Sequence, residues 1–305
     1  MWSTRGMNVL PPSHGVESAA ETLVAAYRSA RAAADAAAVS VRAASPEDLP
    51  AVVALFERTW GAGRSPDASL LRALDHAGNT VLVATSDADT AAAAAPSDGA
   101  AGAAVAGAEP AFVGAALGFL GWAGGIHLHS HMTAVAPGLR GGGVGYALKL
   151  FQRAVCLEHG VDEMRWTFDP LIRRNAHFNL VKLGADVTDF HPDFYGRLDD
   201  AISGSDRSDR FEVRWRLDSP RTLAALAGSA RPHWGAAEPT RDGLPAPEPL
   251  GLNPDFERLR TEHPDAAARQ RADSRVAFTA AFARGLRPEL AGDSWVFTSR
   301  PADPA

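Results

Sequence analysis

"SHMTAVAPGLRGGGVGYALKLFQ", residues 130–152, is the stretch that decides the fold. It passes from an alternating, strand-like segment through Pro137 and a cluster of glycines into an amphipathic helix. Apolar residues recur at helical spacing and form one stripe, which predicts that this helix packs on a sheet. The members of the stripe are Val144, Ala147, Leu148, Phe151, Ala154 and Val155.

The glycines at the start of this helix admit two interpretations. The first amides of a helix have no intrahelical partner, and the helix dipole favours negative charge there. Because glycine has no Cβ, these residues would let a pyrophosphate approach the amides. The same glycines could instead only form the turn between strand and helix. Two common nucleotide motifs do not fit, since the sixth positions counted from Gly141 and Gly143 are Tyr146 and Leu148, and Lys149 follows a leucine.

Size and composition favour a soluble globular protein. The chain has 305 residues, 46% hydrophobic and 22% charged, and its formal net charge of -6 argues against nucleic acid as a partner. Cys156 is the single cysteine, so we expect a buried apolar side chain and no disulfide within the chain. The first residues lack a signal peptide, and the uncharged residues 111–126 are fewer than the ~20 that span a bilayer. The sequence therefore predicts a cytoplasmic protein without a membrane partner.

Patterns along the chain predict one α/β domain with a mixed sheet over residues 39–217. Expected strands cover 39–45, 80–86, 112–123, 126–135, 164–168 and 211–217, and expected helices cover 45–61, 144–160 and 173–184. Residues 1–38 are expected to form a disordered start and an alanine-rich helix, and residues 87–109 a long loop. Residues 218–305 should form a linker rich in Pro and Gly, then a helical extension that ends in a strand.

Two motifs in this domain resemble the signatures of the GCN5-related N-acetyltransferase (GNAT) superfamily. "AVAPGLRGGGVGYALK" follows the pattern V-x-P-x-x-R/Q-x-x-G-x-G/A between a strand and a helix, and "NAHFNLVKLGA" is similar to the second signature. The amino-acid sequence around both motifs also resembles a bacterial subgroup of predicted acetyltransferases. The resemblance covers about residues 39–217. The matching residues are Val135, Pro137, Arg140, Gly143, Gly145, Asn175, Lys182 and Gly184.

The resemblance implies a fold and a co-substrate. The fold would be a mixed, mostly antiparallel sheet of the acyl-CoA N-acyltransferase type, flanked by helices, with an N-terminal helix and a C-terminal extension added. The strand before the glycines would splay from its neighbour, and the pantetheine arm of acetyl-CoA or another acyl-CoA would lie in the gap. The cofactor-binding residues that the resemblance implies are Ala134, Val135, Arg140, Gly141, Gly142, Gly143, Val144, Gly145, Tyr146 and Asn175.

The implied reaction is direct transfer of an acyl group from the thioester to the amine of a small molecule, with an amino acid as a candidate acceptor. Such a reaction needs a base for the ammonium and an acid for the leaving thiolate. Asp169, which follows a strand and precedes Pro170, and His131 are the candidate bases. Many family members supply the acid from a tyrosine in the second helix, but Leu180 occupies that position, and Tyr195 is the nearest downstream substitute.

Less specific interpretations of these residues remain open. Asp169 could only cap its turn, and Tyr195 could only pack. His127, His129 and His131 share one face of a strand and could bind a metal with a fourth ligand, although a solvated or core role is the default. Without the family's tyrosine, the domain could also bind acyl-CoA as a sensor or partner module without turnover.

A pair of arginines offers one hint about the acceptor. Arg207 and Arg210, in the segment before the last expected strand of the domain, could bind a carboxylate on an amino-acid acceptor. A solvated charged turn is the alternative for this segment.

Overall fold

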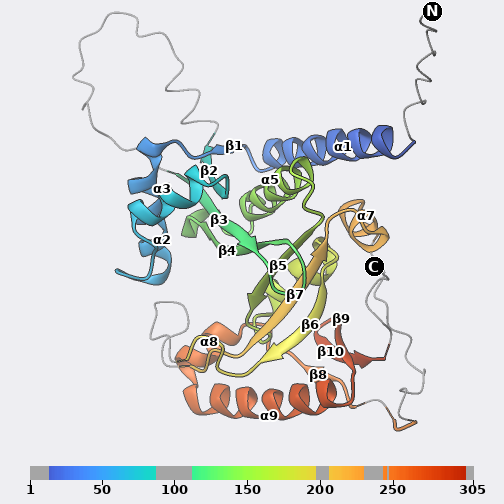
Figure 1. Cartoon of the computed structure of the whole chain (residues 1–305). Coiled ribbons are helices and arrows are strands. Elements are labelled where there is room, and N and C mark those ends of the chain that lie inside the picture. Colours follow the sequence, from blue (N-terminus) through green and yellow to red (C-terminus); the bar gives the residue numbers. More distant parts are fainter. Residues whose placement is uncertain (1–13, 87–111, 197–205, 230–242, 246, 300–305) are drawn as a thin grey trace, which may run out of the picture.

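A mixed seven-stranded sheet forms the centre of the molecule (Figure 1). The computed structural model describes residues 14–86, 112–196, 206–229, 243–245 and 247–299. The strand order is β1-β2-β3-β4-β5-β7-β6, and every neighbouring pair is antiparallel except β4 and β5. The strands are β1 (Val39–Ala43), β2 (Thr80–Ser86), β3 (Gly114–Gly121), β4 (His127–Val135), β5 (Glu163–Phe168), β6 (Asp186–His191) and β7 (Arg210–Arg216). The predicted mixed, mostly antiparallel sheet flanked by helices is thus confirmed.

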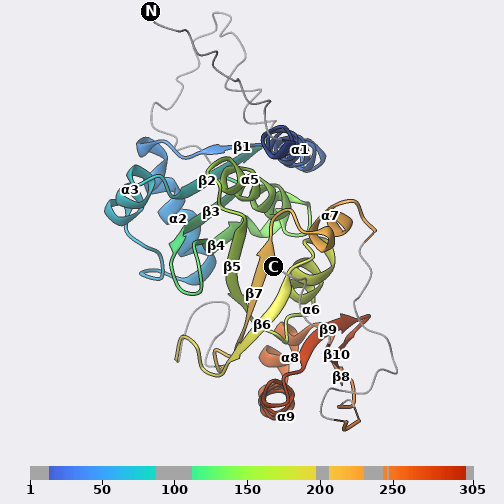
Figure 2. The same ribbon diagram turned by 45° about the vertical axis from the view of Figure 1, so that its right-hand side comes forward.

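Helices cover both faces of this sheet (Figures 1 and 2). Helix α5 (Val144–Glu158) packs on one face, and α1 (His14–Ala36) packs along α5 on its outer side. The short helices α2 (Leu49–Trp60) and α3 (Ala68–His76) cover the opposite face over β2, β3 and β4. Alternate residues of the central strands therefore face two separate apolar clusters, as the period of a strand requires.

The close approach of α5 to the sheet depends on two strand glycines. A Cβ at Gly114 would lie 2.7 Å from Val144 Cγ1, and a Cβ at Gly118 would lie 3.0 Å from Gln152 Nε2, both atoms of α5. Both distances are shorter than ordinary van der Waals contacts. Glycine at these positions lets the first turn of α5 rest on β3, which places the helix start beside the end of β4.

Helix α5 is buried on more than the predicted stripe. Lys149, Gln152 and Arg153 are all buried, whereas Phe151 and Val155 are only half-buried. The amphipathic pattern failed here because the sheet covers one side of the helix and α1 covers another. A helix enclosed in this way need not present a single apolar face.

The C-terminal segment forms a small unit against β6 and β7 (Figure 1). Its elements are α8 (Phe256–Glu262), α9 (Pro264–Ala283) and a sheet of order β8-β10-β9, with β8 (Leu250–Gly251), β9 (Arg287–Ala291) and β10 (Ser294–Thr298). The ring centroids of Phe278 and Phe211 lie 4.6 Å apart, and Trp295 Nε1 donates to Pro170 O at 3.0 Å. The segment predicted as an extension therefore shares the core of the 39–217 domain.

The remaining elements are short. They are η1 (Pro46–Asp48), η2 (Pro137–Leu139), α6 (Arg173–Ala176), the π-helix η3 (His177–Lys182) and α7 (Pro220–Leu226). Sequence patterns did not predict α3, β6, α7 or β9. The expected loop 87–109 and the expected disordered start lie outside the described residues or at their edge. Among the described helices, none is both long and apolar enough to span a membrane.

Candidate active site

Strands β4 and β5 separate after only two residue pairs. The parallel pairs are Leu128 with Met164 and His129 with Arg165. On the other side of β4, Met132 pairs with Leu117 while Ser130 pairs with Gly118, so His131 is the extra residue of a β-bulge. A bulge bends the strand that contains it. The splay that the family resemblance implied is therefore present, and the bulge gives its physical cause.

The edge of β4 beyond the bulge offers unpaired backbone groups to the gap. Ala136 N–H donates to Val113 O at 2.9 Å, which fixes the alternation of hydrogen bonds between β3 and β4. Ala134 consequently pairs with β3, whereas the backbone groups of Thr133 and Val135 point toward β5. The backbone of Val135 thus faces the gap, the backbone of Ala134 faces β3 instead, and Thr133, which was not among the predicted residues, also faces the gap. Backbone groups of alternate strand residues point to opposite neighbouring strands, so the sequence positions alone could have distinguished Ala134 from Thr133 and Val135.

The glycine loop presents free amides at the start of α5. Gly141 and Gly143 have φ angles of 85° and 94°, which glycine adopts without strain. Within the described part of the chain, the amides of Gly141, Gly143, Val144 and Gly145 make no hydrogen bond. The loop is exposed, and a Cβ at Gly141 would meet no atom within 4 Å. Backbone donors at an exposed helix start suit a phosphate group.

Two of the predicted cofactor-binding residues in this loop have amides that are already hydrogen-bonded, and a third, Arg140, offers only its side chain. Gly142 N–H donates to Leu139 O at 3.1 Å, and Tyr146 N–H donates to Gly143 O at 2.9 Å. These two amides are used within the loop, because a 3-10 turn precedes the helix and the first helical bonds begin at Tyr146. The side chain of Arg140 is exposed and makes no ion pair with any described residue, so it is available to an anion.

The far wall of the gap consists of α6 and η3. Asn175 is half-buried in α6 and its side chain makes no hydrogen bond with the described residues. The rings of Tyr146 and Phe178 meet edge to face with their centroids 6.3 Å apart, so the two walls touch near the glycine loop. Leu180 is 3% exposed and belongs to the core. No hydroxyl from its position faces the gap.

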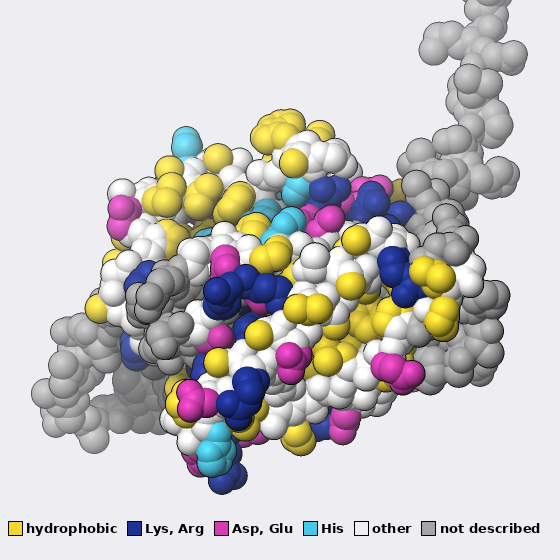
Figure 3. Space-filling view, turned by 90° about the horizontal axis from the view of Figure 1, so that it is seen from below, with side chains coloured by type: hydrophobic (Ala, Val, Ile, Leu, Met, Phe, Trp, Pro, Cys, Tyr) yellow, Lys and Arg dark blue, Asp and Glu magenta, His cyan; other side chains and the backbone are white. Residues whose placement is uncertain are grey.

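Two neutral histidines lie beside the splay, on the face opposite α5. The ring centroids of His129 and His131 are 5.9 Å apart, and Phe119 packs against both. Burial, followed by the charges of His131 and His127, lowers the pKa of His129 to about 4, and burial lowers the pKa of His131. Histidine side chains gather near the middle of the face seen in Figure 3, beside acidic and basic ones. A neutral imidazole can accept a proton at pH 7.

His127 is separated from this pair by its environment. Its ring is buried at the end of the β3–β4 hairpin, where Nδ1 lies 2.8 Å from Gly125 O. A Cβ at Gly121 would lie 2.5 Å from His127 Nε2, so the ring covers that glycine. No group of three or more His, Cys, Asp or Glu side chains among the described residues could hold a metal ion.

A second polar pair on the same region of the sheet was not predicted. His191 Nε2 of β6 lies 2.9 Å from Glu212 Oε2 of β7, which accepts a hydrogen bond from it. Glu212 is directly opposite Thr167 of β5, and Tyr195 Oη lies 3.3 Å from Thr167 Oγ1. The alternation of "FEVRWRL" could have placed Glu212 on this face. Tyr195 is 41% exposed, and the Arg210 guanidinium lies 5.5 Å from its ring centroid.

The environment of Asp169 disfavours the general-base role predicted for it. Arg271 of α9 binds both carboxylate oxygens at 2.8 and 2.6 Å. Burial alone would raise the pKa of Asp169, but the charge and hydrogen bonds of Arg271 hold it below its ordinary value. Leu171 N–H also donates to Asp169 Oδ1 at 2.9 Å. Asp169 is a structural carboxylate that caps its turn and fastens α9 to the domain.

Other charged side chains near the gap also have partners within the protein. Glu163 binds both Arg165 and Arg214. Arg207 pairs with Asp193 at 3.2 Å, so its guanidinium already has an acidic partner. Arg210 donates to the backbone oxygen of Asp209 at 2.9 Å. The geometry therefore gives the two predicted carboxylate-binding arginines different environments, and only Arg210 lies beside Tyr195.

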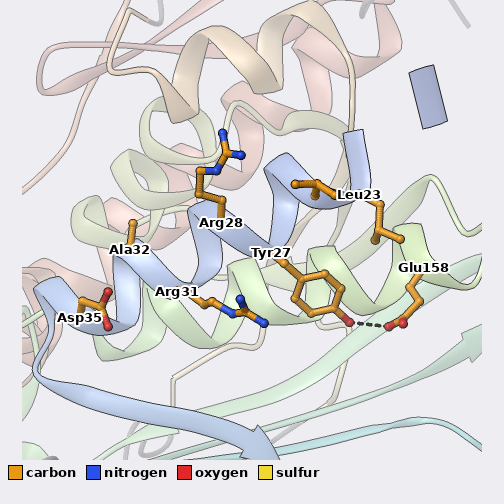
Figure 4. Close-up of a pocket in the computed structure, with 8 residues that line it drawn as sticks. Leu23, Tyr27, Arg28, Arg31, Ala32, Asp35 and Glu158 are labelled. Atoms are coloured by element: carbon orange, nitrogen blue, oxygen red, sulfur yellow. Dashed lines mark hydrogen bonds between the residues drawn. The ribbon is translucent and has the colours of Figure 1, made fainter. Parts of the chain in front are cut away.

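An open hollow of about 700 Å³ lies elsewhere, between α1 and the end of α5 (Figure 4). Tyr27 Oη donates to the carboxylate of Glu158 there, as the dashed line in Figure 4 marks. Burial and this hydrogen bond raise the pKa of Tyr27 to about 12. The contact fastens α1 to α5 at the end of the helix remote from the glycine loop.

No protein-family model matches the chain, and no curated protein is similar to it in sequence. Solved structures with a similar chain path include the ribosomal-protein-S18-alanine N-acetyltransferase from Escherichia coli, at 12% identity over 59% of this chain and 95% of that chain, with a TM-score of 0.43. Naa50 of Arabidopsis thaliana, in complex with a bisubstrate analogue, matches at 18% identity over 58% and 97% with a TM-score of 0.41. An N-acetyltransferase from Staphylococcus aureus matches at 10% identity over 59% and 99% with a TM-score of 0.42.

Proposed function

We propose that the chain is a member of the GNAT superfamily and an acyl-CoA-dependent N-acyltransferase for the amine of a small molecule, such as an amino acid. The observation that supports this most is one juxtaposition. At the start of α5, four amides make no hydrogen bond to any described residue. They directly follow a strand edge whose backbone groups at Thr133 and Val135 pair with none of the described strands. Coenzyme A has the complementary order of groups, a pyrophosphate followed by an arm with two amides.

The residues of the cradle fit this co-substrate. The amides of Gly141, Gly143, Val144 and Gly145 would bind the pyrophosphate, assisted by the dipole of the 15-residue helix α5. The backbone of Thr133 and Val135 would pair with the pantetheine arm as with an added strand. A backbone N–H at this edge would polarise the thioester carbonyl. Asn175 and Arg140 keep their predicted roles beside the arm and the phosphates.

His131 is the base that we propose. It is the bulge residue and part of its side chain is open to solvent beside the splay. The atoms packed around its ring partly desolvate it, and this lowers its pKa, so the imidazole is neutral near pH 7. Deprotonation of the acceptor ammonium would free the nitrogen lone pair for attack on the thioester carbon. The Glu212–His191 pair lies on the same region of the sheet and would attract the ammonium before transfer.

The second candidate function is an acyl-CoA-binding module without turnover. The burial of Leu180 favours it, because no tyrosine hydroxyl is offered from that helix. The two functions share the cradle and differ only in whether thiol is released.

The experiment combines binding with turnover. Acetyl-CoA binding is measured by calorimetry, and thiol release is followed with a panel of amino acids, small amines and short peptides with free N-termini. We expect binding and thiol release with at least one amino acid. Binding without release across the panel would favour the module, and release only with the peptides would redirect the acceptor to protein N-termini.

Position 145 offers a matched pair of variants for the cradle. A Cβ there would lie 3.6 Å from Val135 Cγ2, an ordinary contact, so Gly145→Ala should fold and bind. Gly145→Leu would fill the space between the helix start and the edge of β4, and we expect its acetyl-CoA affinity to fall at least tenfold. Equal affinity of the two variants would contradict the assigned path of the co-substrate.

A further inference from the structure

A lysine is buried on the side of α5 that faces the sheet, without an acidic partner. Lys149 is 5% exposed, and within the described part of the chain no carboxylate pairs with it. Its Nζ donates to Ser130 Oγ at 2.6 Å and lies 4.0 Å from the ring centroid of Trp166. Ser130 in turn donates to Gln152 Oε1 at 2.8 Å. A buried ammonium that has only neutral neighbours is costly and calls for an explanation.

The position of this ammonium coincides with the apex of the gap. Ser130 and Trp166 are the residues that directly follow the last pair of β4 with β5. Lys149 Nζ contacts both of them, so it lies where the two strands part. Val135 lies five residue steps after Ser130, roughly 16 Å at strand spacing, which is comparable to an extended pantetheine arm. An arm that starts at the glycine loop would bring its sulfur near Lys149.

The choice of lysine here is notable in this chain. Only two of the 30 Lys and Arg residues are lysine, namely Lys149 and Lys182. A guanidinium cannot release a proton in a protein, whereas a buried ammonium can. Burial lowers the pKa of Lys149 to about 7. A group with that pKa can give up and regain a proton near neutral pH, as an acid catalyst must.

The titratable side chains near Lys149 carry no charge at pH 7 that would hold its proton in place. Cys156 lies one heptad further along α5, and burial raises its pKa to about 12, so its thiol is neutral. His129 of β4 is within range of the Lys149 charge and is also neutral at pH 7. Trp166, the neighbour on β5, is held by a hydrogen bond from its Nε1 to Asn179 Oδ1 at 3.2 Å. The surroundings of Lys149 are thus fixed and carry no counter-charge.

We infer that Lys149 is the general acid of the proposed acyl transfer, an inference that rests on the proposed function. The amine lone pair forms the bond from nitrogen to the thioester carbon, and the electrons of the carbon–sulfur bond pass to sulfur. The sulfur takes a proton from Lys149 Nζ and leaves as the free thiol of CoA. One proton of the acceptor ammonium passes to His131 before attack, and the nitrogen, again positively charged after attack, gives up a second proton to solvent water. The neutral Lys149 amine regains a proton from solvent. Lys149 acts in place of the tyrosine that Leu180 replaces.

The test compares Lys149→Met with Lys182→Met, which removes the other, exposed lysine, and with Tyr195→Phe, which removes the acid that the sequence suggested. For each full-length variant we measure the acetyl-CoA dissociation constant and kcat between pH 5.5 and 9.5, with the best acceptor from the panel. We expect Lys149→Met to bind acetyl-CoA as the wild type does and to lose about 100-fold in kcat. Wild-type kcat should fall as pH rises above about 7, where Lys149 loses its proton, and this limb should be absent in Lys149→Met.

Two results would overturn the inference while the proposed function stands. One is a wild type that releases thiol together with a Lys149→Met variant of unchanged kcat and pH profile. The other is loss of the alkaline limb in Tyr195→Phe instead. If the wild type does not bind acetyl-CoA, the proposed function itself fails and the inference falls with it. A variant that binds acetyl-CoA normally is folded, so loss of kcat in Lys149→Met cannot be attributed to unfolding.

Discussion

His131 lies at the bulge of β4, so one extra residue both bends the strand and turns an imidazole toward the region where an acceptor would approach. The same bulge explains why β4 leaves β5 and why its outer backbone groups stay unpaired. A single inserted residue therefore both opens the proposed acyl-CoA gap between β4 and β5 and supplies the candidate base.

The first prediction concerns this histidine. His131→Gln should lower kcat about 100-fold and leave acetyl-CoA affinity unchanged, because the imidazole is proposed to accept the ammonium proton. The pKa of His131 is lowered, so wild-type activity should decline only below pH 6.5 as the ring becomes protonated. His76→Gln, at the exposed end of α3, is the control. A kcat equal to that of the control would remove His131 from the mechanism.

The second prediction concerns the stability cost of Lys149. Its pKa is about 7 in the folded chain and ~10.4 when unfolded, so below pH 7 both states hold the proton and the folded state bears the whole burial penalty. Between pH 7 and 10 only the unfolded state still holds the proton. The free energy of unfolding therefore rises with pH over this range, by about 4 kcal/mol in total. Lys149→Met should therefore raise Tm more at pH 6 than at pH 9.5. An equal shift of Tm at both pH values, measured by thermal unfolding, would show that the buried lysine is not titrating.

Sequence patterns could place His131 on the strand before the glycine motif, but they could not show that Asp169 pairs with an arginine. The histidine was recognisable from strand alternation and from its distance to the glycine motif. The partner of Asp169 lies 102 residues away on α9, and no local pattern reports such a contact. Lys149 was not singled out for a related reason, since its burial comes from Ser130 of β4 and Trp166 of β5, which no pattern along α5 reports.

Helix α5 is the element on which the account depends, since it supplies both the amides and Lys149. Its position was predictable from the apolar spacing and the glycine-rich start. The residues that let it approach the sheet, Gly114 and Gly118, were not singled out, because a glycine in a strand pattern does not say what lies above it.

The third prediction tests this packing. In Gly114→Ala the new Cβ would lie 2.7 Å from Val144 Cγ1 and 3.0 Å from Leu148 Cδ1, so α5 must shift. We expect a loss of about 1–3 kcal/mol in the free energy of unfolding, measured in urea, and weaker acetyl-CoA binding. Gly251→Ala, where a Cβ meets no atom within 4 Å, is the control. If Gly114→Ala unfolds at the same urea concentration as the control, the close helix–sheet contact is not required.

On the scale of the whole molecule, the C-terminal segment is part of the domain's core. Arg271 is 2% exposed and joins α9 to Asp169 and Asp206, and aromatic rings of α9 and β10 pack on Phe211. Residues on both sides of the predicted boundary at residue 217 therefore belong to one hydrophobic core, and the boundary marks only where the family motifs end. Composition could indicate helices in this segment but not the surface that they cover.

The fourth prediction follows from this ion pair. Arg271→Ala leaves Asp169 buried without its cation and Asp206 with only the longer pair to Arg260 at 3.5 Å, and we expect a loss of about 3–5 kcal/mol in the free energy of unfolding. Arg258→Ala breaks only an exposed i,i+4 pair with Glu262 and should cost less than about 0.5 kcal/mol. Chemical denaturation of both variants gives the comparison, and similar midpoints would indicate that α9 is not anchored through Arg271.

The most direct test of the central claim is a calorimetric titration of the full chain with acetyl-CoA and, separately, with S-acetylpantetheine, which lacks the pyrophosphate. We expect one acetyl-CoA per chain and binding of S-acetylpantetheine that is weaker by at least tenfold, because the amides of Gly141, Gly143, Val144 and Gly145 would have no phosphate to bind. Equal affinity for the two compounds, or no binding of acetyl-CoA, would contradict the assignment of this glycine loop as a pyrophosphate cradle.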